Sequence, residues 1–78
     1  MPRILIVDDD RGIRSTLRDI LEFEKYDVFE AVDGLDAMVK VKQKDYDVVI
    51  LDIKMPKMDG MHVMDKIQNT KPDLPVVM

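Results

Sequence analysis

Acidic residues follow two short apolar runs in this chain of 78 residues. Asp8–Asp10 come directly after Ile4–Val7, and Asp52 comes directly after Val48–Leu51. An apolar run bounded by turn signals is typical of a short buried strand. A carboxylate at the tip of such a strand costs free energy unless it is paired or binds a cation. Both acidic positions therefore need a chemical explanation.

Carboxylates that lie close together favour a hard cation. Two of them about 5 Å apart repel each other by roughly 3 kcal/mol at an effective dielectric constant near 20, so a cluster holds either protons or a cation. Oxygen ligands suit Mg²⁺ or Mn²⁺, and a carboxylate held by a metal can act as a nucleophile toward phosphorus. We therefore predict that Asp52 is placed to be phosphorylated. The alternative, that each aspartate only caps a helix or forms a turn, accounts for single residues better than for the set.

Three segments between the apolar runs show helical spacing. The first begins after Asp9 or Asp10, either of which can be its N-cap, the second opens at "DG" (33–34), and the third follows "DG" (59–60). Two more strands are predicted at 28–32 and from 76 onward. The predicted positions on the helix faces are Ile13, Leu17, Ile20, Leu21 and Phe23 or Glu24, then Leu35, Met38, Val39 and Val41 or Lys42, then Met61, Met64 and Ile67.

The predicted order is β-α-β-α-β-α-β, which places the chain in the α/β class. Strands that are apolar throughout belong in a parallel sheet with helices on both faces. In such sheets ligands bind outside the carboxyl ends of the strands. If the first and third strands are neighbours, Asp8, Asp9 and Asp52 converge on one spot at that edge.

The composition limits the class of protein and its partners. A length of 78 residues, with 46% hydrophobic and 36% charged residues, allows a single domain. The net charge of −4 argues against a nucleic-acid-binding surface. Without cysteine there is neither a disulfide nor a thiolate metal site. No apolar run approaches the roughly 20 residues that span a bilayer, and the N-terminus does not read as a signal peptide. We expect a cytoplasmic protein without membrane contact.

Two motifs resemble the receiver domains of two-component response regulators. They are "ILIVDDD" (4–10) and "DVVILDIKMPKMDG" (47–60), and the resemblance runs over the whole chain. It implies a flavodoxin-like fold with strand order 2-1-3-4-5. It also implies a signalling module, not a turnover enzyme, that accepts a phosphoryl group from a histidine kinase or a phosphotransfer protein.

The resemblance assigns roles to individual residues by position. Asp52 corresponds to the phosphoacceptor, and Asp9 to a direct ligand of Mg²⁺ (or Mn²⁺) together with Asp52. Asp8 corresponds to the residue that contacts the cation chiefly through water, and the backbone carbonyl of Lys54 to the third protein ligand. The positions that shape the loop after the phosphorylation site are Pro56 and Gly60.

The chain departs from the family after the fourth predicted strand. Family members continue, with a Ser or Thr at the end of that strand and an aromatic residue and a Lys in the fifth, whereas this chain stops at Met78. We therefore expect residues 1–78 to be the N-terminal two-thirds of a receiver domain. We further expect impaired phosphorylation, and self-association into a homo-oligomer through "PVVM" (75–78) and the stripe Ile13, Leu17 and Ile20.

Two other functions stay open at this stage. One is an interaction fragment that self-associates and does not transfer phosphate. The other is an aspartyl-phosphate hydrolase of the haloacid dehalogenase type, which usually has a second Asp two residues after the nucleophile. Lys54 occupies that position here and counts against the hydrolase.

Overall fold

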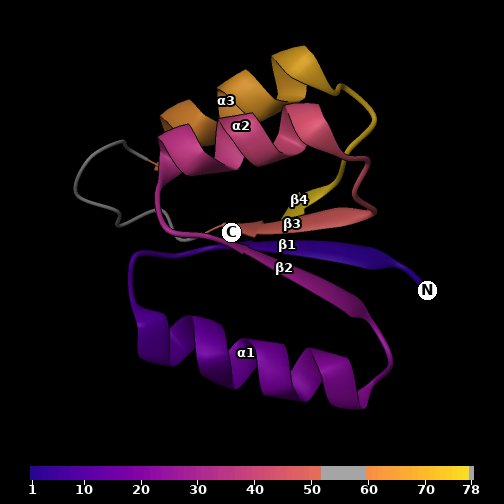
Figure 1. Ribbon diagram of the computed structural model, residues 1–78. Coiled ribbons are helices and arrows are strands. Elements are labelled where there is room, and N and C mark those ends of the chain that lie inside the picture. The colour runs from indigo at the N-terminus through magenta and orange to yellow at the C-terminus, as the bar shows by residue number, and fades with distance from the viewer. Residues whose placement is uncertain (52–59, 78) are drawn as a thin grey trace.

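The computed structural model describes residues 1–51 and 60–77 and alternates strands and helices throughout (Figure 1). The first strand starts one residue earlier than predicted, and the strand predicted at 28–32 both starts and ends one residue earlier. The elements are β1 (Arg3–Val7), α1 (Arg11–Phe23), β2 (Asp27–Ala31), α2 (Gly34–Gln43), β3 (Val48–Leu51), α3 (Gly60–Thr70) and β4 (Val76–Val77).

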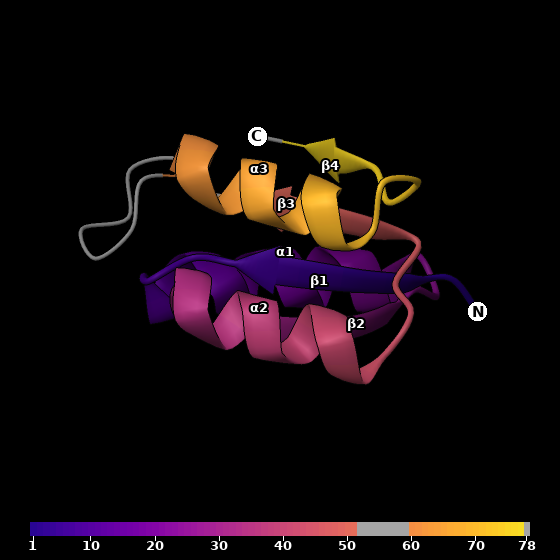
Figure 2. The same cartoon turned by 90° about the horizontal axis from the view of Figure 1, so that it is seen from above.

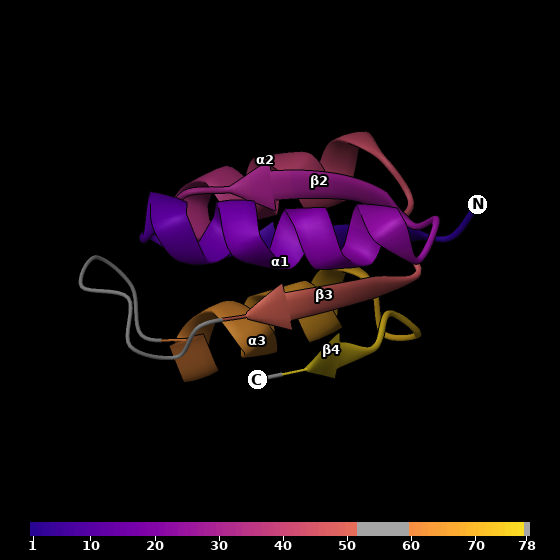
Figure 3. The same cartoon turned by 90° about the horizontal axis from the view of Figure 1, so that it is seen from below.

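The four strands form one parallel sheet in the order β2-β1-β3-β4. Helix α1 covers one face of the sheet, and α2 and α3 cover the other (Figure 1). Seen from above, α2 and α3 run beside each other over the sheet (Figure 2), and the view from below shows β2 and β3 pointing toward the same edge (Figure 3). Strand β1 lies between them and is parallel to both. The predicted flavodoxin-like fold is confirmed for these elements.

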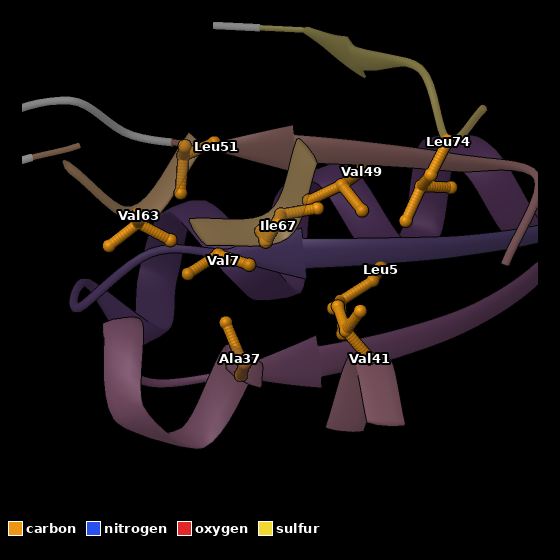
Figure 4. Close-up of a cluster of buried hydrophobic side chains, with 10 residues drawn as sticks. Leu5, Val7, Ala37, Val41, Val49, Leu51, Val63, Ile67 and Leu74 are labelled. Atoms are coloured by element: carbon orange, nitrogen blue, oxygen red, sulfur yellow. The ribbon is translucent and has the colours of Figure 1, made fainter. Parts of the chain in front are cut away.

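Alternation along β1 divides the core into two layers. Leu5 and Val7 point to the side of α2 and α3, whereas Ile4 and Ile6 point to the side of α1, and all four are buried. Because the central strand is covered on both faces, it can be apolar throughout. Figure 4 shows the larger layer, whose labelled members are Leu5, Val7, Ala37, Val41, Val49, Leu51, Val63, Ile67 and Leu74.

Helix α1 buries only part of its predicted apolar stripe. Leu17 and Leu21 pack against the core layer of Ile4, Ile6 and Val28. Ile13 and Ile20 are 47% and 56% exposed. The predicted apolar stripe is wider than the side of α1 that contacts the sheet, so Ile13 and Ile20 at its edge face outward.

The predicted apolar faces of α2 and α3 need correction. In α2 the predicted Val41 is buried and the predicted Met38 packs against the core, which confirms these two positions. Leu35 and Val39 are instead more than half exposed, and Ala37 is buried on the side of α2 that meets the sheet. In α3 the buried positions include Val63, which the spacing of the methionines did not indicate, together with the predicted Ile67. No helix within residues 1–51 and 60–77 is long and apolar enough to cross a membrane.

Candidate functional site

Asp8 stands at the carboxyl end of the central strand β1 and is held by its backbone and its side chain. It is 6% exposed, and its N–H donates to the carbonyl of Ala31 at 3.1 Å. Its Oδ1 accepts a hydrogen bond from the N–H of Asp10 at 2.8 Å. We refer to Asp8–Asp10 as the acidic loop. Its first residue, Asp8, is therefore anchored to the neighbouring strand β2.

Asp10 is the N-cap of α1, which settles the choice left open between Asp9 and Asp10. Its backbone is extended (φ −91°, ψ 113°), and its Oδ1 accepts from the N–H groups of Gly12 at 2.8 Å and Ile13 at 3.2 Å. A Cβ at position 12 would lie 3.2 Å from this oxygen, so glycine suits the tight first turn. Asp9 lies exposed between the buried Asp8 and the capping Asp10.

The sheet register brings the two acidic strand ends together. Val7 of β1 pairs with Leu51 of β3, so the residues that precede Asp8 and Asp52 lie side by side. The adjacency of the first and third strands is thus confirmed. Asp52, Lys54 and Pro56 lie outside the described residues, whereas Gly60 is the first residue of α3.

The described part of the edge fits an oxygen-preferring cation but does not complete its site. Asp8 and Asp9 supply carboxylates at a strand end, the donor chemistry that Mg²⁺ prefers. Within residues 1–51 and 60–77 no three acidic, histidine or cysteine side chains cluster closely enough to hold a metal ion. The predicted site includes Asp52, which lies outside the described residues.

The sequence did not predict a partly buried network of charged residues that lies behind the acidic loop. The guanidinium of Arg14 donates from Nη1 to the carbonyl of Asp8 at 2.7 Å and from Nε to Glu30 Oε1 at 3.0 Å. The Nη1 of Arg18 donates to Glu30 Oε2 at 2.6 Å, and the Nζ of Lys40 donates to the carbonyl of Glu30. The available signal was a single glutamate within a strand that was expected to be apolar throughout.

The network makes the stability of the fold depend on pH. The hydrogen bond from Arg18 lowers the pKa of the Glu30 carboxyl most, the one from Arg14 lowers it further, and burial opposes both. A lowered pKa in the folded state adds stability above the ordinary value of 4.5, and this stability is lost as the pH falls through the folded-state pKa.

Replacing Glu30 by glutamine should therefore destabilise the fold in a pH-dependent way. We expect Glu30→Gln to lower the free energy of unfolding by about 1 kcal/mol at neutral pH, and the difference from wild type to shrink as the pH falls below 4.5. Urea unfolding across a pH series measures it. The exposed Glu24→Gln is the control, with a change below about 0.5 kcal/mol. A difference that stays constant with pH would contradict the ionic role of Glu30.

Comparison with known proteins gives one consistent family. The profile of the response regulator receiver domain matches residues 4–78. Over 75 residues the chain is 43% identical to the response regulator MprA of Mycobacterium sp. (strain KMS) and 41% identical to that of Mycobacterium avium. The match covers 96% of this chain and 33% of each relative, so the chain spans about a third of the curated relatives' length.

Solved structures agree with the sequence comparison. The chemotaxis protein CheY4 of Vibrio cholerae superposes with a TM-score of 0.93 at 31% identity, over 97% of this chain and 65% of that one. The response regulator TrrA of Thermotoga maritima, solved in complex with Mg(2+)-BeF, gives 0.93 at 41% identity, over 97% and 66%. TrrA in complex with the histidine kinase ThkA gives 0.92 at 41% identity, again over 97% and 66%. The chain belongs to the response regulator receiver domain family.

Proposed function

We propose that this receiver domain accepts a phosphoryl group on Asp52 in two-component signalling. The observation that carries the proposal is the register of β1 and β3, which pairs Val7 with Leu51 and so starts both acidic segments at one edge of the sheet. The buried Asp8 and the exposed Asp9 supply carboxylates at that edge. The donor is the phosphohistidine of a histidine kinase or a phosphotransfer protein.

The proposed cation site combines the acidic loop with the segment after β3. Asp9, Asp52 and the carbonyl of Lys54 would bind Mg²⁺ or Mn²⁺ directly, and Asp8 would contact it through water. The described geometry supports this division, because Asp8 already has one carboxylate oxygen engaged by the N–H of Asp10 whereas Asp9 is exposed. When bound, the cation would offset negative charge on the carboxylates and on the transferred phosphoryl oxygens.

The proposed transfer needs little else from the chain than position and charge. A carboxylate oxygen of Asp52 attacks phosphorus, a phosphorus–oxygen bond forms, and the phosphorus–nitrogen bond of the donor breaks. The leaving imidazole nitrogen keeps the electron pair. The acidic loop is pre-ordered by the cap of Asp10 and the backbone hydrogen bond of Asp8, so less ordering remains to be done during transfer. The chain is then a phosphoacceptor and not a turnover enzyme.

The surface beside the acidic loop supports docking of a protein donor there. A shallow hollow next to the loop has a mixed lining in which Ile13 is 47% exposed. TrrA, a relative with the same fold, has been solved with a histidine kinase, and we propose that a kinase of the same kind is the partner here. We also propose that the protein is located in the cytoplasm, where such a kinase would act on it. The lining residues of the hollow are Asp10, Gly12, Ile13, Thr16 and Leu17.

Phosphorylation by acetyl phosphate tests the proposed function without a cognate kinase. We expect a time course of intact-mass spectra to show one added phosphoryl group with Mg²⁺, none with a chelator, and none in Asp52→Asn. The expectation of slow modification stays a prediction that the same time course measures. A phosphate that Asp52→Asn retains would contradict the site.

The same experiment separates the proposal from the interaction fragment. Absence of phosphate under every condition, together with concentration-dependent sedimentation, would favour that alternative. Self-association itself stays a prediction.

A further inference from the structure

We propose that Arg14 is a positioning residue that holds the acidic loop in the conformation required by the cation site; this rests on the function proposed above. Its guanidinium joins the carbonyl of Asp8, at 2.7 Å, to the carboxylate of Glu30, at 3.0 Å. The Arg14 side chain is 11% exposed, so both contacts are largely shielded from water. Arg14 donates to the backbone of Asp8, and we propose that it acts through this residue.

Arg14 adds a further constraint on Asp8. The N–H of Asp8 donates to the carbonyl of Ala31, and its Oδ1 accepts from the N–H of Asp10. The hydrogen bond from Arg14 holds the remaining backbone group, the carbonyl. With N–H, carbonyl and carboxylate each held, the peptide that leads into Asp9 has a defined direction. This direction decides where the exposed carboxylate of Asp9 points.

Glu30 holds Arg14 in place from the neighbouring strand. Its Oε1 accepts from Arg14 and its Oε2 from Arg18, while its backbone carbonyl accepts from Lys40 of α2. The anchor therefore joins α1, β2 and α2 behind the loop. Only a planar fork of donors reaches both Glu30 and the Asp8 carbonyl in this way, and a lysine ammonium at position 14 can satisfy one of them well.

Arg18 provides a matched control within the same helix. It lies one turn after Arg14 and also donates to Glu30, at 2.6 Å, with a second ion pair to Glu22 at 3.4 Å. Its ion pairs are with these two glutamates, and its side chain is 40% exposed. Removal of Arg18 weakens the same anchor without releasing the carbonyl of Asp8. A general loss of charge or stability affects both variants, whereas a positioning role affects Arg14 alone.

The test compares Arg14→Met with Arg18→Met in two independent measurements. Without metal, we expect Arg14→Met to shift the carbonyl ¹³C resonance of Asp8 and to lower the order parameters of the Asp9 and Asp10 amides, while Arg18→Met leaves them unchanged. With metal, we expect the affinity for Mn²⁺ to fall about tenfold or more in Arg14→Met and less than about twofold in Arg18→Met. A tenfold loss is typical when a residue that supports a metal ligand is replaced. Arg14→Lys should restore part of the affinity.

The two measurements separate this inference from the proposed function. If wild type binds no Mn²⁺ at the loop, the cation site fails, and the metal-free spectra still decide the role of Arg14. Equal order parameters of the Asp9 and Asp10 amides in the two methionine variants would overturn the inference. Where wild type binds Mn²⁺, equal Mn²⁺ affinities of the two variants would overturn it as well. If Arg14→Met does not fold, Glu30→Gln replaces it, with a smaller change of the Asp8 resonance in the same direction; an unchanged resonance would overturn the inference.

Discussion

Replacing Asp9 by alanine should abolish saturable binding of Mg²⁺ at the acidic loop. Asp9 is the exposed carboxylate between a buried neighbour and the helix cap, so it is the loop side chain best able to contact a cation directly. Its removal takes away the proposed direct ligand, and the loss of affinity should exceed the roughly 10- to 100-fold typical of residues that only support ligands. Amide shifts of Asp8–Asp10 in a Mg²⁺ titration measure the affinity.

Asp27→Ala is the matched control for this experiment. Asp27 is exposed and begins β2, at the opposite end of the sheet from the acidic loop. Its replacement changes the net charge by the same amount as Asp9→Ala. We expect the affinity to stay within about twofold of wild type, since exposed charges at such distances are screened by salt. Equal losses in the two variants would indicate general electrostatic attraction and contradict a specific site.

Replacing Leu5 by alanine should destabilise the fold more than any other change considered. Leu5 is 0% exposed in the central strand, between β2 and β3, and belongs to the larger core layer. Burial of this kind makes a Leu→Ala change cost about 2–5 kcal/mol through lost transfer energy and the cavity left behind. A domain this small has only modest total stability, so the variant should be largely unfolded under mild conditions.

Urea unfolding followed by circular dichroism measures this loss. Leu35→Ala is the control, because Leu35 is 64% exposed on α2 and its truncation should cost less than about 0.5 kcal/mol. Leu5→Val keeps the fold measurable if Leu5→Ala unfolds, with a loss near 1 kcal/mol for one methylene group. A loss below 1 kcal/mol for Leu5→Ala would contradict the placement of Leu5 in the core.

The strand pattern made most of the fold predictable. Ile4–Val7 and Val48–Leu51 are apolar on both faces, which only a covered parallel sheet accommodates, and the aspartates that follow mark the carboxyl edge. Helix starts were predictable because caps are local: Asp10 and the first turn of α1 lie within three residues of each other. The strand pattern alone left open whether the first and third strands are neighbours. The family resemblance implied it, and the structure shows it, with Val7 paired to Leu51.

The charge network and the helix faces were less predictable for a physical reason. Glu30 meets Arg14 and Arg18 across 16 and 12 residues of sequence, a pairing that no local rule indicates. The buried side of α3 depends on where the sheet lies. Val63 and Ile67 are fully buried there, and the predicted Met64 packs only partly buried against the same core. The roles of Asp52, Lys54 and Pro56 still rest on the sequence and the family resemblance.

Line broadening by Mn²⁺ tests the central claim most directly, because it asks whether the acidic loop and Asp52 share one cation. In ¹⁵N-labelled protein at substoichiometric Mn²⁺, the amides of Asp8–Asp10 and those of residues 52–54 should broaden over the same range of concentration. In Asp9→Ala, the broadening of both sets of amides should disappear together. Broadening confined to one of the two segments, or unaffected by Asp9→Ala, would contradict a shared site at the carboxyl ends of β1 and β3.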